Sequence, residues 1–356
     1  MQKNNIENIN IKKLEKSKIE ITGSIPVEAF SSFRKKALEN INNEITVDGF
    51  RKGKITESVL VSKVGEMSVL EEMAEIALSK FYPEIIEKEK IDAIGYPEIS
   101  ITKLAANNPL EFKIITTVIP EIKIGDYKKI ALKNNSKKEE KIEITEKEID
   151  DAILRIRKSR VDHTGHDHER LTPEEHEKIV ESSMPELSED FVKSLGDFKD
   201  INDFKEKIKL SLLEEKKIMA QEKKRIALSD AILEASSAEI PELLIESETR
   251  RIEAQFSDDI SRMGVKLEDY LKHAKKTIDD LRAEWKPHAE KKAKLQLILN
   301  DIVKLEKINV DAKEIENEVK AILAHYKDAN QEQAYTYAET VLTNEKVYKF
   351  LEEIEK

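Results

Sequence analysis

A helical period runs almost without interruption through the second half of this 356-residue chain, from Met184 to the C-terminus. Apolar side chains recur there every three or four residues, which places them on one face of a helix. Gly and Pro, which interrupt helices, number only nine each in the whole chain. We expect Pro241 to begin a helix and Pro287 to kink or break one. The predicted helices are 188–195, 201–236, 241–263, 267–273, 277–307, 311–327, 331–339 and 343–355.

The first part of the chain has a different period, in which apolar and polar side chains alternate. Residues 8–22, 98–104 and 110–122 alternate apolar and polar side chains, which predicts strands, the first with a polar turn inside it. Gly23, Ser24 and Pro26 should end the first strand and open a helix. That helix would carry an apolar face made of Val27, Phe30, Phe33, Leu38 and Ile41. A short helix capped by Thr56 and a longer one from Met67 past Phe81, restarting at Pro83, complete an α+β unit over residues 1–122.

Two less regular segments separate these halves. Residues 123–160 form a linker, which contains a polar run and a helix over 143–158 capped by Thr145. Residues 161–183 have no apolar period and hold four of the seven histidines. The predicted fold is therefore an α+β N-terminal domain (1–122), a linker (123–160), a polar connector (161–183) and an all-α C-terminal domain (184–356) with projecting helical arms. Its long helices and low aromatic content predict an elongated molecule.

Composition and charge exclude several classes of function. The chain has no cysteine, which rules out disulfides and thiol chemistry. Its N-terminus lacks the apolar core of a signal peptide, and no apolar run reaches the length of a membrane span. Residues 1–130 contain 20 basic and 20 acidic side chains, so the net charge of −11 belongs to the rear. The absence of a signal peptide and a membrane span predicts a cytoplasmic protein without membrane contact. The charge balance predicts that any contact with nucleic acid is local.

No constellation in the sequence predicts an active enzyme or a bound cofactor. There is no phosphate-binding glycine loop, so ATP use is not implied. Neighbouring carboxylates such as Glu71 and Glu72 are typical of a solvated helix face rather than an acid–base pair.

The clearest local motif is Gly49-Phe50-Arg51-Lys52-Gly53-Lys54. Two glycines allow a tight turn, and three cations with one aromatic side chain gather at its tip. Arg and Lys suit phosphate oxygens, and Phe50 can stack on a partner or enter an apolar slot. Taken alone, the residues leave a second interpretation open, which is an ordinary solvated loop whose Phe50 folds back into the core.

Several segments resemble the bacterial trigger factor family. The GFRKGK loop, which lies between two helices, is similar to the ribosome-binding signature of that family. The resemblance extends over roughly 1–160 and 184–356, and its longest matching segments are 69–100, 111–130, 184–217, 240–252 and 266–304. One position departs from the family, which usually has Pro where this chain has Thr56. We interpret this as the exchange of a helix-starting Pro for an N-cap.

The resemblance implies an ATP-independent chaperone that binds the large ribosomal subunit near the exit tunnel, at ribosomal protein and rRNA. Phe50, Arg51 and Lys52 would make the contacts, while Gly49, Gly53 and Lys54 shape and extend the loop. Unfolded and nascent polypeptides would be the other partners, held without a cofactor. Whether the free protein forms a homodimer stays open. The alternative is a helical scaffold or interaction protein that does not dock on ribosomes.

The family also carries a prolyl-isomerase domain of the FK506-binding type between its linker and its C-terminal domain. Here only 161–183 lies between the two similar blocks, and it contains no Phe, Tyr or Trp. We therefore expect isomerase activity to be absent, although a cryptic isomerase stays open as an alternative. The connector also suggests a metal hypothesis, because His163, His166, His168 and His176 could supply imidazole ligands. A flexible polar linker without a functional metal site is the preferred interpretation.

Overall fold

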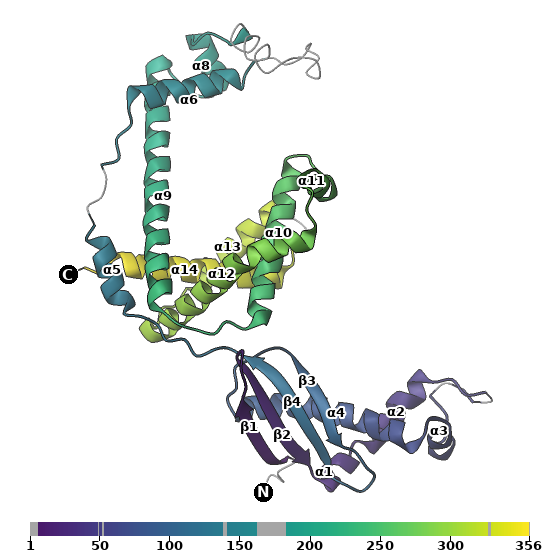
Figure 1. Cartoon of the computed structure of the whole chain (residues 1–356). Coiled ribbons are helices and arrows are strands. Elements are labelled where there is room, and N and C mark those ends of the chain that lie inside the picture. Colours follow the sequence, from purple (N-terminus) through teal and green to yellow (C-terminus); the bar gives the residue numbers. More distant parts are fainter. Residues whose placement is uncertain are drawn as a thin grey trace. The chain divides into compact units, whose positions relative to one another are not determined.

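The computed structural model describes residues 6–48, 50–51, 53–137, 141–161, 183–326 and 329–355. Its chain groups into two compact units. The first joins Met1–Gly125 to Leu233–Thr343, and the second joins Asp126–Ile232 to Asn344–Lys356. A small sheet in the N-terminal part and helices in the rest confirm the predicted fold class (Figure 1). The predicted division into four segments stays a prediction.

One antiparallel sheet organises the N-terminal part. Its strands lie in the order β1-β2-β4-β3, so the hairpin of β3 and β4 pairs back on the first hairpin, as predicted. Alternate side chains of β2 and β4, such as Ile21 and Phe112, are buried on one face. The strands are β1 (Glu7–Lys13), β2 (Lys18–Ile25), β3 (Ala93–Lys103) and β4 (Leu110–Val118).

Four helices complete the N-terminal part: α4 packs against the buried face of the sheet, and α1, α2 and α3 pack against α4. The longest, α4, buries a full stripe of apolar side chains that includes Phe81 and Ile85, and its Tyr82 hydroxyl lies 3.0 Å from Oγ1 of Thr116 on β4. Sheet and helices share one core of twenty buried residues. The helices are α1 (Val27–Ser31), α2 (Arg34–Glu44), α3 (Glu57–Val64) and α4 (Glu66–Lys88).

Two expectations about the first strand and helix were wrong. Strand β2 continues through Gly23 and Ser24 to Ile25. Gly23 is needed for packing rather than for a strand end, because a Cβ there would lie 2.8 Å from Cζ of Phe112. The single helix expected after Pro26 is divided into α1 and α2.

The predicted effects of Thr56 and Pro83 also need correction. Thr56 occupies the N-cap position of α3 as predicted, but its side chain makes no capping hydrogen bond. Helix α4 continues through Pro83 instead of restarting there. The proline is exposed while Phe81 and Ile85 on either side are buried, so the backbone carbonyl that loses its helical donor faces solvent and packing holds the helix together.

The second unit is built around the 35-residue helix α9. A small core joins one part of it to α6 and α8, and includes Ile149, Ile153, Val192 and Phe204. The predicted cap of α6 is confirmed as a capping box between Thr145 and Glu148. Helix α5 was missed, because its short apolar stripe lies in a polar region. The helices are α5 (Tyr127–Asn135), α6 (Glu146–Lys158), α8 (Glu189–Leu195) and α9 (Ile201–Ala235).

The remaining helices follow the sequence pattern closely. Predicted caps are confirmed at Thr277, Asp311 and Asn330, each of which accepts a backbone N–H. The expected kink or break at Pro287 is wrong in so far as α12 runs through it as one helix. The remaining helices are α10 (Glu242–Arg262), α11 (Leu267–Ala274), α12 (Ile278–Glu306), α13 (Ala312–His325) and α14 (Gln331–Glu352).

Helix α14 joins two helices that the sequence predicted separately, 331–339 and 343–355. The residues between them include no Gly or Pro. Thr340 also donates its hydroxyl to the carbonyl of Thr336 at 2.7 Å, so its polar side chain is satisfied within the helix.

Candidate functional site

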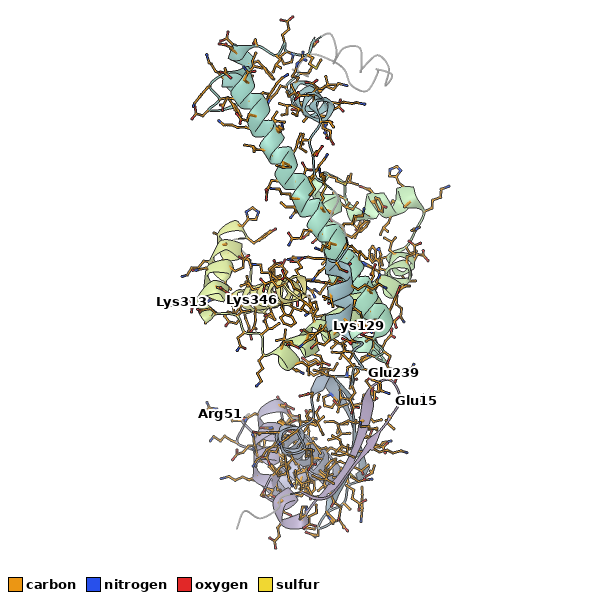
Figure 2. All side chains as sticks on the ribbon, turned by 90° about the vertical axis from the view of Figure 1, so that its left-hand side faces the viewer. Glu15, Arg51, Lys129, Glu239, Lys313 and Lys346 are labelled. Carbon is orange, nitrogen blue, oxygen red and sulfur yellow. The ribbon has the colours of Figure 1, made fainter. Side chains whose placement is uncertain are left out.

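The predicted docking loop connects α2 to α3 at the surface of the N-terminal α+β part. Phe50 is 39% exposed, and Arg51 and Lys54 are also exposed. Figure 2 shows Arg51 at the outside of this region. Gly49 and Lys52 lie outside the described residues. The described part of the loop therefore presents an aromatic ring and two cations to solvent, and the interpretation in which Phe50 folds back into the core does not hold.

The base of the loop is fastened by Asn42, near the end of α2. Its side-chain amide donates to the carbonyl of Ile55 at 2.9 Å and accepts from the N–H of Ile55 at 3.1 Å. The Asn42 carbonyl also accepts from the N–H of Gly53 at 3.0 Å. Together these three bonds hold the two ends of the loop side by side, much as a neighbouring strand would. No sequence pattern indicates this role, because an Asn near a helix end is ordinary.

The turn itself depends on Gly53. Its φ of +78° lies in the left-handed region, and a Cβ there would lie 2.9 Å from Oδ1 of Asn43. Backbone bonds from Phe50 to Val47 (3.1 Å) and from Lys54 to Arg51 (2.9 Å) tighten the loop on both sides. The second glycine of the motif is thus required by conformation, as a tight turn predicts.

An ion-pair cluster secures the helices on either side of the loop. Arg34 of α2 donates Nε to Glu57 at 3.1 Å and binds the carboxylate of Glu66 through both terminal nitrogens. The hydrogen bond from Arg34 lowers the pKa of Glu66 below its ordinary value. After the loop, Ile55 and Leu60 are buried in the common core. The loop therefore extends from a rigid frame.

Aromatic and apolar side chains gather on the helical arm formed by α10, α11 and α12. Phe256 packs against Tyr270 and Trp285, with ring centroids 5.3 Å apart in each pair. Met263, which follows α10, is 75% exposed. On α9, Met219 is 57% exposed. Methionine side chains are flexible and suit promiscuous contact, and both of these lie at the surface.

Two further predictions concern a metal site in the connector and the absence of a membrane span. The histidines at 163, 166, 168 and 176 lie outside the described residues. Within the described ranges, no group of His, Asp or Glu is arranged to hold a metal ion. No described helix is long and apolar enough to cross a membrane.

Two family models match this chain. The family model described as bacterial trigger factor protein matches residues 7–156, and the model of the trigger factor C-terminus matches residues 200–353. The chain belongs to the bacterial trigger factor family. Neither matched trigger factor segment is an isomerase domain, and residues 157–199 lie between them.

Individual relatives agree. The trigger factor of Carboxydothermus hydrogenoformans is 24% identical over 393 residues, which cover 90% of this chain and 91% of that protein. The trigger factor of Clostridium kluyveri is 23% identical over 421 residues, which cover 97% of this chain and 98% of that protein. A solved structure concerning promiscuous substrate recognition in folding and assembly by the trigger factor chaperone matches with a TM-score of 0.55. It covers 98% of this chain and 100% of that one at 17% identity, which shows a shared fold.

Proposed function

We propose that this trigger factor chaperone docks on the large ribosomal subunit near the exit tunnel through residues 49–54, and shields nascent polypeptides without ATP. The observation that carries the proposal is the fastened loop with Phe50 and Arg51 turned outward. A preformed loop loses little conformational entropy when it binds, and its cations suit rRNA phosphate. Docking would raise the effective concentration of the chaperone around the emerging chain.

Client binding is assigned to apolar side chains left exposed on the helices, above all Met263 and its neighbours on the arm and Met219 on α9. Contacts of this kind are individually weak and adaptable. A client would leave as folding buries its own apolar segments, so the cycle needs no nucleotide. Homodimerisation of the free protein stays a question for measurement.

Ribosome co-sedimentation tests the docking. The variant Phe50→Ala/Arg51→Ala/Lys52→Ala should lose most of its pelleted fraction. The matched control Lys36→Ala/Lys63→Ala removes two exposed cations from the same α+β part and leaves the loop intact, so it should pellet like wild type. Equal pelleting of wild type and the loop variant would contradict docking through this loop and favour the helical scaffold.

We also propose that prolyl-isomerase activity is absent. The 421-residue alignment with the C. kluyveri relative is longer than this chain, so that protein has residues without a counterpart here. The connector, without Phe, Tyr or Trp, lacks the side chains for an aromatic proline pocket. A refolding assay limited by proline isomerisation should show no acceleration, and a clear acceleration would overturn this proposal.

A further inference from the structure

A pocket rich in lysine lies on α9, in the second unit, whereas the docking loop and the apolar arm belong to the first. It has a volume of about 830 Å³ and lies within the second unit, where α9, the end of α5 and the segment leading into α6 surround it. Figure 1 shows that segment running beside α9, and Lys216 Nζ donates to its Glu143 carbonyl at 2.9 Å. Six lysines line the pocket, namely Lys137, Lys141, Lys216, Lys217, Lys223 and Lys224. Such a cluster is unexpected in the acidic rear of the chain.

The positive charge of the pocket is only partly neutralised. Among the described residues, the lining carboxylates are Glu143 and Glu352, and Glu352 is already bound by Arg225 at 2.7 Å. Lys216 pairs with Glu148 at 2.6 Å. Among the described residues, Lys141 and Lys223 are exposed and form no ion pair. The pocket therefore presents cations that an incoming anion can reach without first breaking a strong pair.

The walls also determine what kind of anion fits. Ile142, Ala220 and Ala227 add apolar surface between the lysines. From Lys216 to Ala227, α9 rises by about 16 Å, at ~1.5 Å per residue. An extended chain at ~3.3 Å per residue would place about five residues along that length. The length of this wall thus matches a short extended peptide.

We propose that this lysine-lined pocket binds acidic segments of unfolded client chains, with client carboxylates on the lysines and small apolar side chains against Ile142 and the alanines. This inference rests on the proposed chaperone function, since its ligand is a client segment. It adds an electrostatic site to the apolar contacts of the arm. Acidic stretches, which an apolar surface alone holds poorly, would be retained through salt-sensitive contacts.

An acidic peptide fits better than RNA. No aromatic side chain of the described residues lines the pocket to stack on a base, and every lining cation is a lysine rather than an arginine. Glu143 and Glu352 in the wall would repel a continuous phosphate chain. The net charge of −11 also opposes a long polyanion more than a short segment with a few carboxylates.

The test is fluorescence anisotropy with the full chain and a labelled twelve-residue unstructured peptide that alternates Glu or Asp with Ala, Val and Leu. A second peptide carries Gln and Asn at the same positions. We expect the acidic peptide to bind more tightly, and its affinity to fall as salt is raised. The variant Lys141→Gln/Lys223→Gln should weaken its binding about fivefold, which is the combined effect of two modest ion pairs.

Lys147→Gln/Lys209→Gln is the matched control, since both lysines are exposed in the same unit and neither lines the pocket. It should bind the acidic peptide like wild type, and both variants should have unchanged circular dichroism. Equal binding of the two peptides, or equal loss in both variants, would overturn the proposal. Displacement of the acidic peptide by a single-stranded RNA of equal charge at lower concentration would overturn it in favour of RNA. Ribosome pelleting and suppression of aggregation of an uncharged client should not depend on these lysines. A negative result for peptide binding at the pocket would therefore leave the tests of the proposed function unaffected.

Discussion

The N-terminal α+β part and the helices that follow it bury their apolar side chains in different ways. In the first, sheet and helices converge on one core of twenty buried residues. In the rest, three separate clusters hold four or five buried residues each, and further buried side chains such as Ile298 and Ile302 lie outside these three. A shared core makes a stiff frame, whereas small clusters can open locally at a lower free energy. This difference fits the proposal that the first part presents a fixed loop and the second binds clients adaptably.

The largest effect should come from Phe81→Ala. Phe81 is 1% exposed and packs edge-to-face on Phe33, with ring centroids 5.7 Å apart. Its removal leaves a cavity in the shared core and should cost about 3–5 kcal/mol of unfolding free energy. Urea denaturation followed by hydrogen exchange should show that β2, β4 and α4 lose protection together. Loss of protection confined to α4 would contradict a single shared core.

Phe204→Ala is the matched change in a divided core. Phe204 is also buried and packs edge-to-face on Phe198 at 5.0 Å. Its cluster has only four buried residues, so we expect a cost of about 3 kcal/mol, at the lower end for such a truncation. Hydrogen exchange should increase only in α6, α8 and the adjoining turns of α9. Increased exchange in the N-terminal sheet would show that the cores are coupled.

Asn42→Ala should separate presentation of the loop from the loop residues themselves. It leaves the N–H and carbonyl of Ile55 without their partner, which costs about 1–2 kcal/mol. Ribosome pelleting should fall although Phe50 and Arg51 are intact. Asn43→Ala, an exposed neighbour, is the control and should pellet like wild type. Unchanged pelleting of Asn42→Ala would mean that the fastening is irrelevant to docking.

The smallest effect concerns pH. Hydrogen bonds from Lys216 and from Thr145 lower the pKa of Glu148 to about 2. Because the folded pKa is depressed, its stabilisation is present above the ordinary value near 4.5 and is lost as pH falls from there toward 2. NMR titration of the Glu148 amide should therefore report unwinding of the α6 cap near pH 2. A transition near pH 4.5 would contradict this, and Glu146→Gln, an exposed carboxylate in the same turn, should leave it unchanged.

Alternation and helical period predicted the four strands and most helices, because these elements bury one face. The errors have a common physical origin. Pro83 and Pro287 were expected to disturb helices, but neighbouring packing holds both helices continuous. Helix α5 is anchored by contacts remote in sequence, since Asn135 donates to the carbonyls of Leu351, Glu352 and Ile354. No local pattern records such a contact.

The candidate site was predictable only in part. The motif identified the loop because its composition is local, and the two described cations are exposed as expected. Asn42 and the lysine-lined pocket were missed. Both depend on which segments meet in space: Asn42 lies 13 residues before Ile55, and Lys137 lies far from Lys216 in sequence.

The most direct test of the account is suppression of aggregation of an unfolded client, measured without ribosomes and without ATP, for wild type and for Phe50→Ala/Arg51→Ala/Lys52→Ala. The proposed docking loop and the proposed client-binding side chains are different residues, so both proteins should suppress aggregation equally. Loss of suppression in the loop variant, or a requirement for ATP in wild type, would contradict it.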